Sequence, residues 1–100
     1  NKLIKQIYST KKIENSKGDS VNPFPVSIPY ELGISLYQIV KNKNITNTLE
    51  IGLAYGTSAL FICQALKDKG GGTHTSIDPS QKEVWKNTGI HNIKKAGLED

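Results

Sequence analysis

The stretch LEIGLAYGTS, residues 49–58, decides the fold of this 100-residue chain. Its first residues favour a β-strand that ends at Gly52, and a turn with a second glycine follows. A helical pattern then begins at about Thr57 and runs to Lys69. A strand that leads through a tight glycine turn into a helix is typical of parallel α/β sheets, whose ligands bind just outside the carboxyl ends of the strands. We therefore expect a binding site at this turn.

Helices and strands alternate along the chain on both sides of this stretch. The patterns predict helices over 29–42 and 57–69, strands over 48–51 and 73–78, and a final helix near the carboxyl end. Such alternation implies an α/β fold with a parallel sheet and right-handed crossovers. The helix over 29–42 should bury an apolar stripe made of Leu32, Leu36, Ile39 and Val40.

The final helix has its own start and stop signals. Ser80 and Glu83 have the spacing of a capping box, which predicts that the helix begins there. Gly89 should interrupt it, and Gly97 should end it in a left-handed cap that brings Leu98 back over the last turn.

Residues 1–23 are predicted to be an extension that precedes the domain proper, which covers 24–100. A weak helical pattern over 1–14 is followed by turn-forming residues over 15–23, which predict a loop. In the next helix Gly33 costs about 1 kcal/mol relative to alanine, so we expect a close neighbour there, either packed backbone or ligand.

The glycine turn has the chemistry of an anion site. Glycines let a ligand approach the backbone, and the free N–H groups at the start of the following helix attract an anion such as a carboxylate. Glu50 can hold a positively charged amino group, and the hydroxyls of Thr57 and Ser58 can donate to the carboxylate. Because the spacing is Gly52-x-x-x-Gly56, it fails the G-x-G-x-x-G pattern of dinucleotide sites. The alternative is a tight turn with glycines for geometry only.

Asp78 supplies a second signal at the end of the second predicted strand. It follows Gly56 by 22 residues, and an acidic residue at about that distance on the neighbouring strand can accept both hydroxyls of a ribose. The alternative is an Asp that caps the next helix beside Pro79. We judge that alternative weaker because Ser80 already has the place of the cap.

Together these residues resemble class I S-adenosylmethionine-dependent methyltransferases. The segment over 49–58 is similar to the first motif of small-molecule O-methyltransferases of the catechol and caffeoyl-CoA type, with Ala54 in place of a middle glycine. The segments over 29–33 and 77–98 resemble the flanking parts of that group and of a related bacterial-type family, so the resemblance covers about 24–100. It implies an S-adenosyl-L-methionine site made of Glu50, Gly52, Leu53, Ala54, Tyr55, Gly56, Thr57, Ser58, Asp78 and Pro79.

The resemblance also implies a fold and a reaction. The fold would be Rossmann-like, and this chain would supply the N-terminal part of a doubly wound, mainly parallel sheet of seven strands. We expect the chain to be the front half of such a domain, with the catalytic base and any metal ligands further along. The reaction would be methyl transfer to an oxygen of a small molecule or sugar. Two alternatives stay open: a non-catalytic cofactor-binding or interaction module, and a nucleotide- or NAD-binding domain, against which the glycine spacing argues.

The amino-acid composition argues against some classes of binding partner. The net charge of +4 comes from scattered lysines without any arginine, which argues against nucleic-acid binding. No run of about 18 apolar residues exists, so no membrane span is expected. One cysteine, Cys63, suits a reducing compartment, and we expect a cytoplasmic enzyme that acts on a small-molecule acceptor, with a homodimer left open.

For several side chains that could carry chemistry we expect a structural role instead. Cys63 lies in an apolar run and is expected to be a core residue. His74 and His91 form no zinc-type cluster, and we expect them to be structural. Trp85 and Gln81 can face the adenine or the substrate, but a tryptophan on a helix more often belongs to the core.

Overall fold

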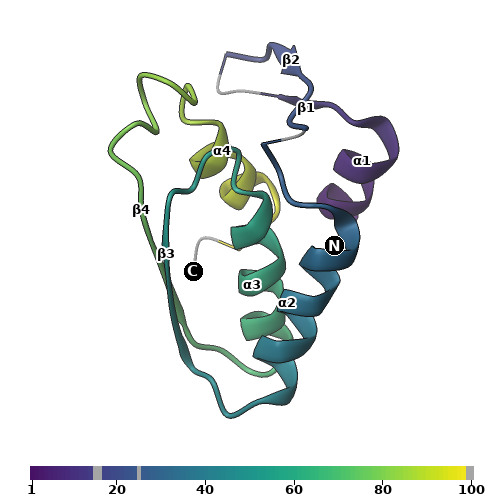
Figure 1. The fold of residues 1–100 in the computed structure, drawn as a ribbon, viewed down its shortest axis with the longest axis vertical. Coiled ribbons are helices and arrows are strands. Elements are labelled where there is room, and N and C mark those ends of the chain that lie inside the picture. Colours follow the sequence, from purple (N-terminus) through teal and green to yellow (C-terminus); the bar gives the residue numbers. More distant parts are fainter. Residues whose placement is uncertain (15–16, 25, 99–100) are drawn as a thin grey trace.

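The computed structural model describes residues 1–14, 17–24 and 26–98. Its helices lie on one side of a pair of long strands, and a short hairpin lies beside the N-terminal helix (Figure 1). The elements, in chain order, are α1 (Lys2–Thr10), β1 (Ile13–Glu14), β2 (Ser20–Val21), α2 (Tyr30–Asn42), β3 (Asn47–Ile51), α3 (Thr57–Asp68), β4 (Thr73–Ile77) and α4 (Thr88–Lys95).

Strands β3 and β4 form the parallel pair that the sequence predicts. They run in register from Asn47 opposite Thr73 to Ile51 opposite Ile77. Side chains alternate along both strands, so that one face packs toward the helices and the other is open. The open face carries apolar side chains with large exposed fractions, namely Leu49 (64%), Ile51 (76%) and Ile77 (51%). A parallel α/β arrangement with helices on one face is consistent with part of a Rossmann-like fold.

Helix α3 is the centre of the core, as its nearly all-round apolar sequence predicts. It buries Leu60 and Phe61 against α1 on one flank, and Ile62 and Leu66 against α2 on the other. Helix α1, which belongs to the predicted extension, takes part in this packing, because its buried face belongs to the same cluster as Leu60 and Phe61.

The buried face of α2 differs from the predicted stripe. Val40 is buried, but Leu32 and Ile39 are 51% and 48% exposed. The helix is instead turned so that Gly33 lies directly beneath the ring of Phe61. Only a residue without a side chain allows that approach, so the fit of Phe61 onto Gly33 orients the helix in preference to its most apolar stripe. The close neighbour expected at Gly33 is therefore a side chain.

Replacing Gly33 with alanine should destabilise the protein by about 2 kcal/mol, although alanine favours helix formation. A Cβ atom at Gly33 would lie 2.2 Å from the nearest ring atom of Phe61, and that ring is buried. Thermal or urea unfolding of the variant measures the change. A matched Ser35→Ala change on the exposed face of the same helix should be neutral or slightly stabilising; an equally stable Gly33→Ala variant would contradict this packing.

The C-terminal segment departs from the predicted helix start. Residues 79–87 form successive turns, and α4 begins only at Thr88. The prediction that the capping box at Ser80 and Glu83 starts the helix was therefore wrong. The helical pattern is interrupted at Lys86 and Asn87, whose φ angles are 53° and 58°. Gly89, where the sequence predicted the interruption, is helical.

The end of α4 confirms the predicted cap. Gly97 has a φ of 74°, the N–H of Leu98 donates to the carbonyl of Ile93, and that of Gly97 donates to the carbonyl of Lys94. These are the two hydrogen bonds of a Schellman motif. At the other end of the chain, the predicted loop over 15–23 contains strand β2, where Val21 pairs with Ile13 in an antiparallel hairpin. Within that loop, residues 15 and 16 lie outside the described residues.

Candidate functional site

The glycine turn lies at the carboxyl ends of β3 and β4. The N–H of Gly52 donates to the carbonyl of Ile77 (2.6 Å), which fixes the start of the turn to the neighbouring strand. Gly52, Ala54 and Gly56 have φ angles of 90°, 47° and 82°. Left-handed backbone of this kind favours glycine. Ala54 adopts it at a cost in conformational strain, which explains why a glycine is favoured at this position. A Cβ at Gly52 would meet no atom within 4 Å, so the space above it is open.

The far side of the turn is pressed against the start of α4. A Cβ atom built on Gly56 would lie 2.9 Å from the carbonyl oxygen of Gly89, and one built on Gly89 would lie 2.6 Å from that of Ala54. Two facing glycines thus let backbone meet backbone, and the turn is held between β4 and α4. Gly89, which the sequence suggested as a helix break, instead makes this contact possible.

The Asp78 carboxylate binds the backbone of the turn. Its Oδ2 accepts hydrogen bonds from the N–H groups of Leu53 (3.0 Å) and Ala54 (2.9 Å) and from the Gln81 amide (3.2 Å), while its Oδ1 accepts one from the N–H of Ser80 (3.0 Å). These bonds, with that of Ala54 foremost, lower the pKa of Asp78 against a smaller opposing effect of burial. Asp78 does not cap the next helix, which begins at Thr88 with Asn87 as its N-cap; its bond to Ser80 belongs to the turns that follow β4.

The Glu50 carboxylate is the centre of a polar network between the sheet and α3. Its Oε2 accepts a hydrogen bond from the Ser58 hydroxyl (2.7 Å), and its Oε1 contacts the Ser76 hydroxyl (3.0 Å) and His74 Nε2 (3.2 Å). Burial acts to raise the pKa of Glu50, but hydrogen bonds from His74, Ser58 and Ser76 outweigh it and lower that pKa. Glu50 is therefore an anion that is anchored directly behind the turn.

The start of α3 has no side-chain cap. Gly56 occupies the N-cap position and makes no side-chain cap. The Thr57 hydroxyl, predicted to be a ligand donor, is buried and pairs with the Ser27 hydroxyl (2.7 Å), while that of Ser58 donates to Glu50. In this structure both hydroxyls are therefore engaged within the protein, and the free donors at this end of the helix are N–H groups. Sequence reasoning missed Ser27, which lies in no motif of the sequence.

The remaining predicted residues lie around this core. Tyr55 is half-buried and stacks edge-on against Trp85, with ring centroids 5.2 Å apart. Pro79 is exposed at the first turn after β4. Gln81 is buried and its amide bridges the carbonyl of Ala54 and Asp78, which ties it to the turn and leaves it no free face for an adenine.

Cys63 and His74 have surroundings that the sequence did not define. Burial and the nearby Glu50 raise the pKa of the Cys63 thiol to about 11, which supports an unreactive packing role. His74, expected to be an isolated structural residue, is part of the Glu50 network. No sequence pattern marked it, because its partner is 24 residues away on the adjacent strand.

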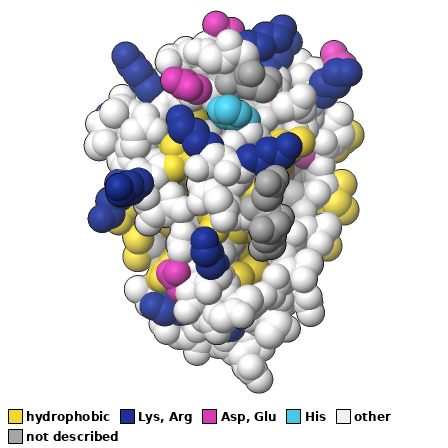
Figure 2. Space-filling model, turned by 180° about the vertical axis from the view of Figure 1, so that it is seen from behind, with side chains coloured by type: hydrophobic (Ala, Val, Ile, Leu, Met, Phe, Trp, Pro, Cys, Tyr) yellow, Lys and Arg dark blue, Asp and Glu magenta, His cyan; other side chains and the backbone are white. Residues whose placement is uncertain are grey.

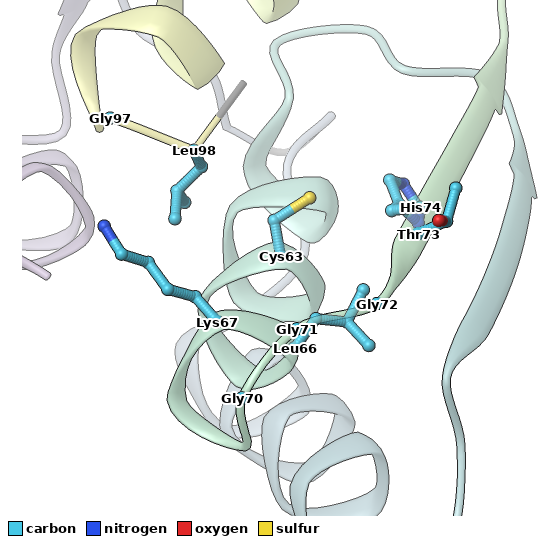
Figure 3. A pocket seen from close by; sticks show the side chains of 10 residues that line it. All are labelled: Cys63, Leu66, Lys67, Gly70, Gly71, Gly72, Thr73, His74, Gly97 and Leu98. Atoms are coloured by element: carbon cyan, nitrogen blue, oxygen red, sulfur yellow. The ribbon is translucent and has the colours of Figure 1, made fainter. Parts of the chain in front are cut away.

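A cavity lies away from the turn. It has a volume of about 470 Å³ and lies between α3, the start of β4 and the end of α4, where Cys63, His74 and Leu98 line it (Figure 3). Gly70–Gly72 and Thr73 line it, so it lies at the amino end of β4, opposite to the end where the turn lies. Ligands of parallel sheets bind at the carboxyl ends, so we do not assign the cofactor to this cavity.

Three further findings concern surface charge, membrane-spanning helices and metal ligands. Lysine side chains are dispersed over the face seen in Figure 2 and do not form one continuous stripe. Within the described part of the chain, every helix is too short or too polar to cross a lipid bilayer. Among the same residues, no three His, Cys, Asp or Glu side chains are grouped closely enough to hold a metal ion.

Comparison with known proteins identifies the family. A family model described as "Methyltransferase domain" matches residues 49–100, which begin within β3 and include the turn, Asp78 and α4. A protein of Arabidopsis thaliana, provisionally named a caffeoyl-CoA O-methyltransferase, is 38% identical over 74 residues, which are 74% of this chain and 30% of that protein. The chain belongs to the methyltransferase-domain family, in its class I, O-methyltransferase-like form. It spans about 30% of the length of the relative that it matches.

Proposed function

We propose that the turn over residues 52–56 binds S-adenosyl-L-methionine and that the protein transfers its methyl group to an oxygen of a small molecule. The observation that carries the proposal is the combination of left-handed glycine backbone, open space above Gly52 and an uncapped start of α3, with anions at Glu50 and Asp78 beside it. This arrangement suits a ligand that has a carboxylate, an amino group and a ribose.

Each part of the cofactor has a proposed partner. The N–H groups at the start of α3 suit the methionine carboxylate, because helix N-termini favour anions. Glu50 suits the amino group, directly or through water. Asp78 suits the ribose hydroxyls: within the described residues its Oδ1 accepts one hydrogen bond, from the N–H of Ser80, so acceptor capacity remains on that oxygen.

The cofactor itself supplies the activated methyl group, and the protein contributes binding and orientation. We propose that the acceptor binds outside the turn over residues 52–56. The name of the Arabidopsis relative makes caffeoyl-CoA the first acceptor to test. We also propose a cytoplasmic location, because Cys63 is unpaired and a free thiol suits a reducing compartment. We further propose that the protein forms a homodimer.

Calorimetric titration of the purified protein with S-adenosylmethionine, S-adenosylhomocysteine and NAD tests the proposal. We expect the first two to bind and NAD not to bind. A transfer assay with caffeoyl-CoA then tests the acceptor. Binding without any transfer to a panel of hydroxylated acceptors would favour a non-catalytic cofactor-binding module, while binding of NAD alone would overturn the assignment.

A further inference from the structure

His74 is a buried residue that takes no part in the proposed cofactor contacts. Its side chain is only 6% exposed and lies between Thr48 and Glu50 of the adjacent strand. Nδ1 is 2.7 Å from the Thr48 hydroxyl, and Nε2 is 3.2 Å from Glu50 Oε1 and 3.0 Å from the Ser76 hydroxyl. We propose that His74 is a positioning residue that fixes Glu50 behind the cofactor turn and makes cofactor affinity depend on pH. This inference rests on the proposed function of the turn.

The contacts define which ring nitrogen carries the proton. Ionised Glu50 can only accept hydrogen bonds, so we assign the proton of neutral His74 to Nε2, the nitrogen that faces Glu50. A hydroxyl can both donate and accept, so Thr48 can donate to a neutral Nδ1 or accept from a protonated one. His74 can therefore gain its second proton at Nδ1 without losing its bond to Glu50. The geometry of the pair is kept while its charge changes.

That change of charge reaches the ligand site through Glu50. With neutral His74 the pair has a charge of −1, which attracts the amino group of the cofactor, and with charged His74 the pair is neutral. Other groups that can titrate or carry charge face the same space from the helices, namely Cys63 and Lys67 on α3 and Lys94 on α4. Burial raises the pKa of the Cys63 thiol to about 11, so the thiol is neutral in neutral and mildly acidic solution.

Titration with S-adenosylhomocysteine at several pH values tests the proposal. Between about pH 8 and about pH 5.5, wild-type affinity should fall roughly three- to tenfold. His74→Gln keeps a donor for Glu50 but cannot gain charge, so its affinity should match that of the wild type at pH 8 and stay flat with pH. His74→Leu removes the donor and should bind more weakly than the wild type at pH 8. His91→Gln, the matched change at the other histidine, should keep the wild-type profile.

Nitrogen-15 spectra of the imidazoles provide a readout that needs no ligand. At about pH 8 the spectra should show the proton of His74 on Nε2, and Glu50→Gln should change its titration. A proton on Nδ1, a titration indifferent to Glu50→Gln, or a His74→Gln variant that keeps the wild-type pH profile would overturn the proposal. If the wild type binds no cofactor at any pH, the proposed function fails, and the spectra still decide whether His74 and Glu50 are coupled.

Discussion

Replacing Gly56 with alanine should destabilise the protein by about 3 kcal/mol and abolish cofactor binding. Two costs add up: left-handed backbone costs alanine roughly 1–2 kcal/mol, and a contact in a packed region costs about as much again. The φ of Gly56 is 82°, and its added Cβ would lie 2.9 Å from the carbonyl oxygen of Gly89. That oxygen belongs to the backbone of α4 and cannot turn aside, so the turn must open. Chemical unfolding and cofactor titration measure the two effects.

Gly18 supplies the matched control for this change. Its φ of 84° is nearly the same, but a Cβ built on it would meet no atom within 4 Å, and it lies in the hairpin away from the turn. Gly18→Ala should therefore lose only the conformational part, about 1 kcal/mol, and bind cofactor normally. Equal losses in the two variants would show that the contact with Gly89 contributes nothing.

Asp78→Asn should reduce cofactor affinity by at least tenfold and also destabilise the turn by about 2 kcal/mol at neutral pH. Asparagine loses the charge that the N–H groups of Leu53, Ala54 and Ser80 face. It can also turn its NH₂ group toward those donors. Fluorescence or calorimetric titration measures the affinity, and urea unfolding measures the stability. Glu83→Gln, an exposed change of the same type nearby, should alter neither quantity.

The stability effect of Asp78 should depend on pH in one direction. Its pKa in the folded protein is lower than in the unfolded chain, so its contribution is complete above the unfolded value of about 4. The contribution is lost as the pH falls through the lower folded value. The stability gap between wild type and Asp78→Asn should therefore be largest at neutral pH and close in acid. A gap that widens toward acid would contradict the hydrogen bonds described here.

Ribose recognition needs a test that separates it from the structural role of Asp78. Analogues of S-adenosylhomocysteine without ribose hydroxyls should bind the wild type more weakly, and Asp78→Asn should bind them and the parent compound alike. If the variant still prefers the hydroxylated compound as strongly as the wild type does, Asp78 stabilises the turn without binding the ribose.

The local elements were predictable because their signals lie within a few residues of one another. The turn over 52–56, the strands beside it and the cap at Gly97 follow from glycine spacing, β-propensity and helix-end chemistry. All three are properties of short segments, so tertiary contacts had little to change.

The features that were missed depend on contacts between distant segments. The orientation of α2 is set by Phe61 fitting onto Gly33, and the true helix start after β4 by Lys86 and Asn87, which have no glycine signal. The role of His74 depends on strand register, since it lies opposite Thr48 only when β3 and β4 are aligned. Sequence patterns list candidate groups; register and packing decide which of them meet.

The edge-on pair of Trp85 and Tyr55 has a practical consequence for spectroscopy. Trp85 is the only tryptophan of the chain, and its partner belongs to the turn itself. Indole emission is sensitive to the packing and hydration of its surroundings, so a ligand that moves Tyr55 would change the intensity or wavelength of that emission. The protein thus contains its own optical reporter, and the opening or ordering of the turn can be followed in real time without an attached dye.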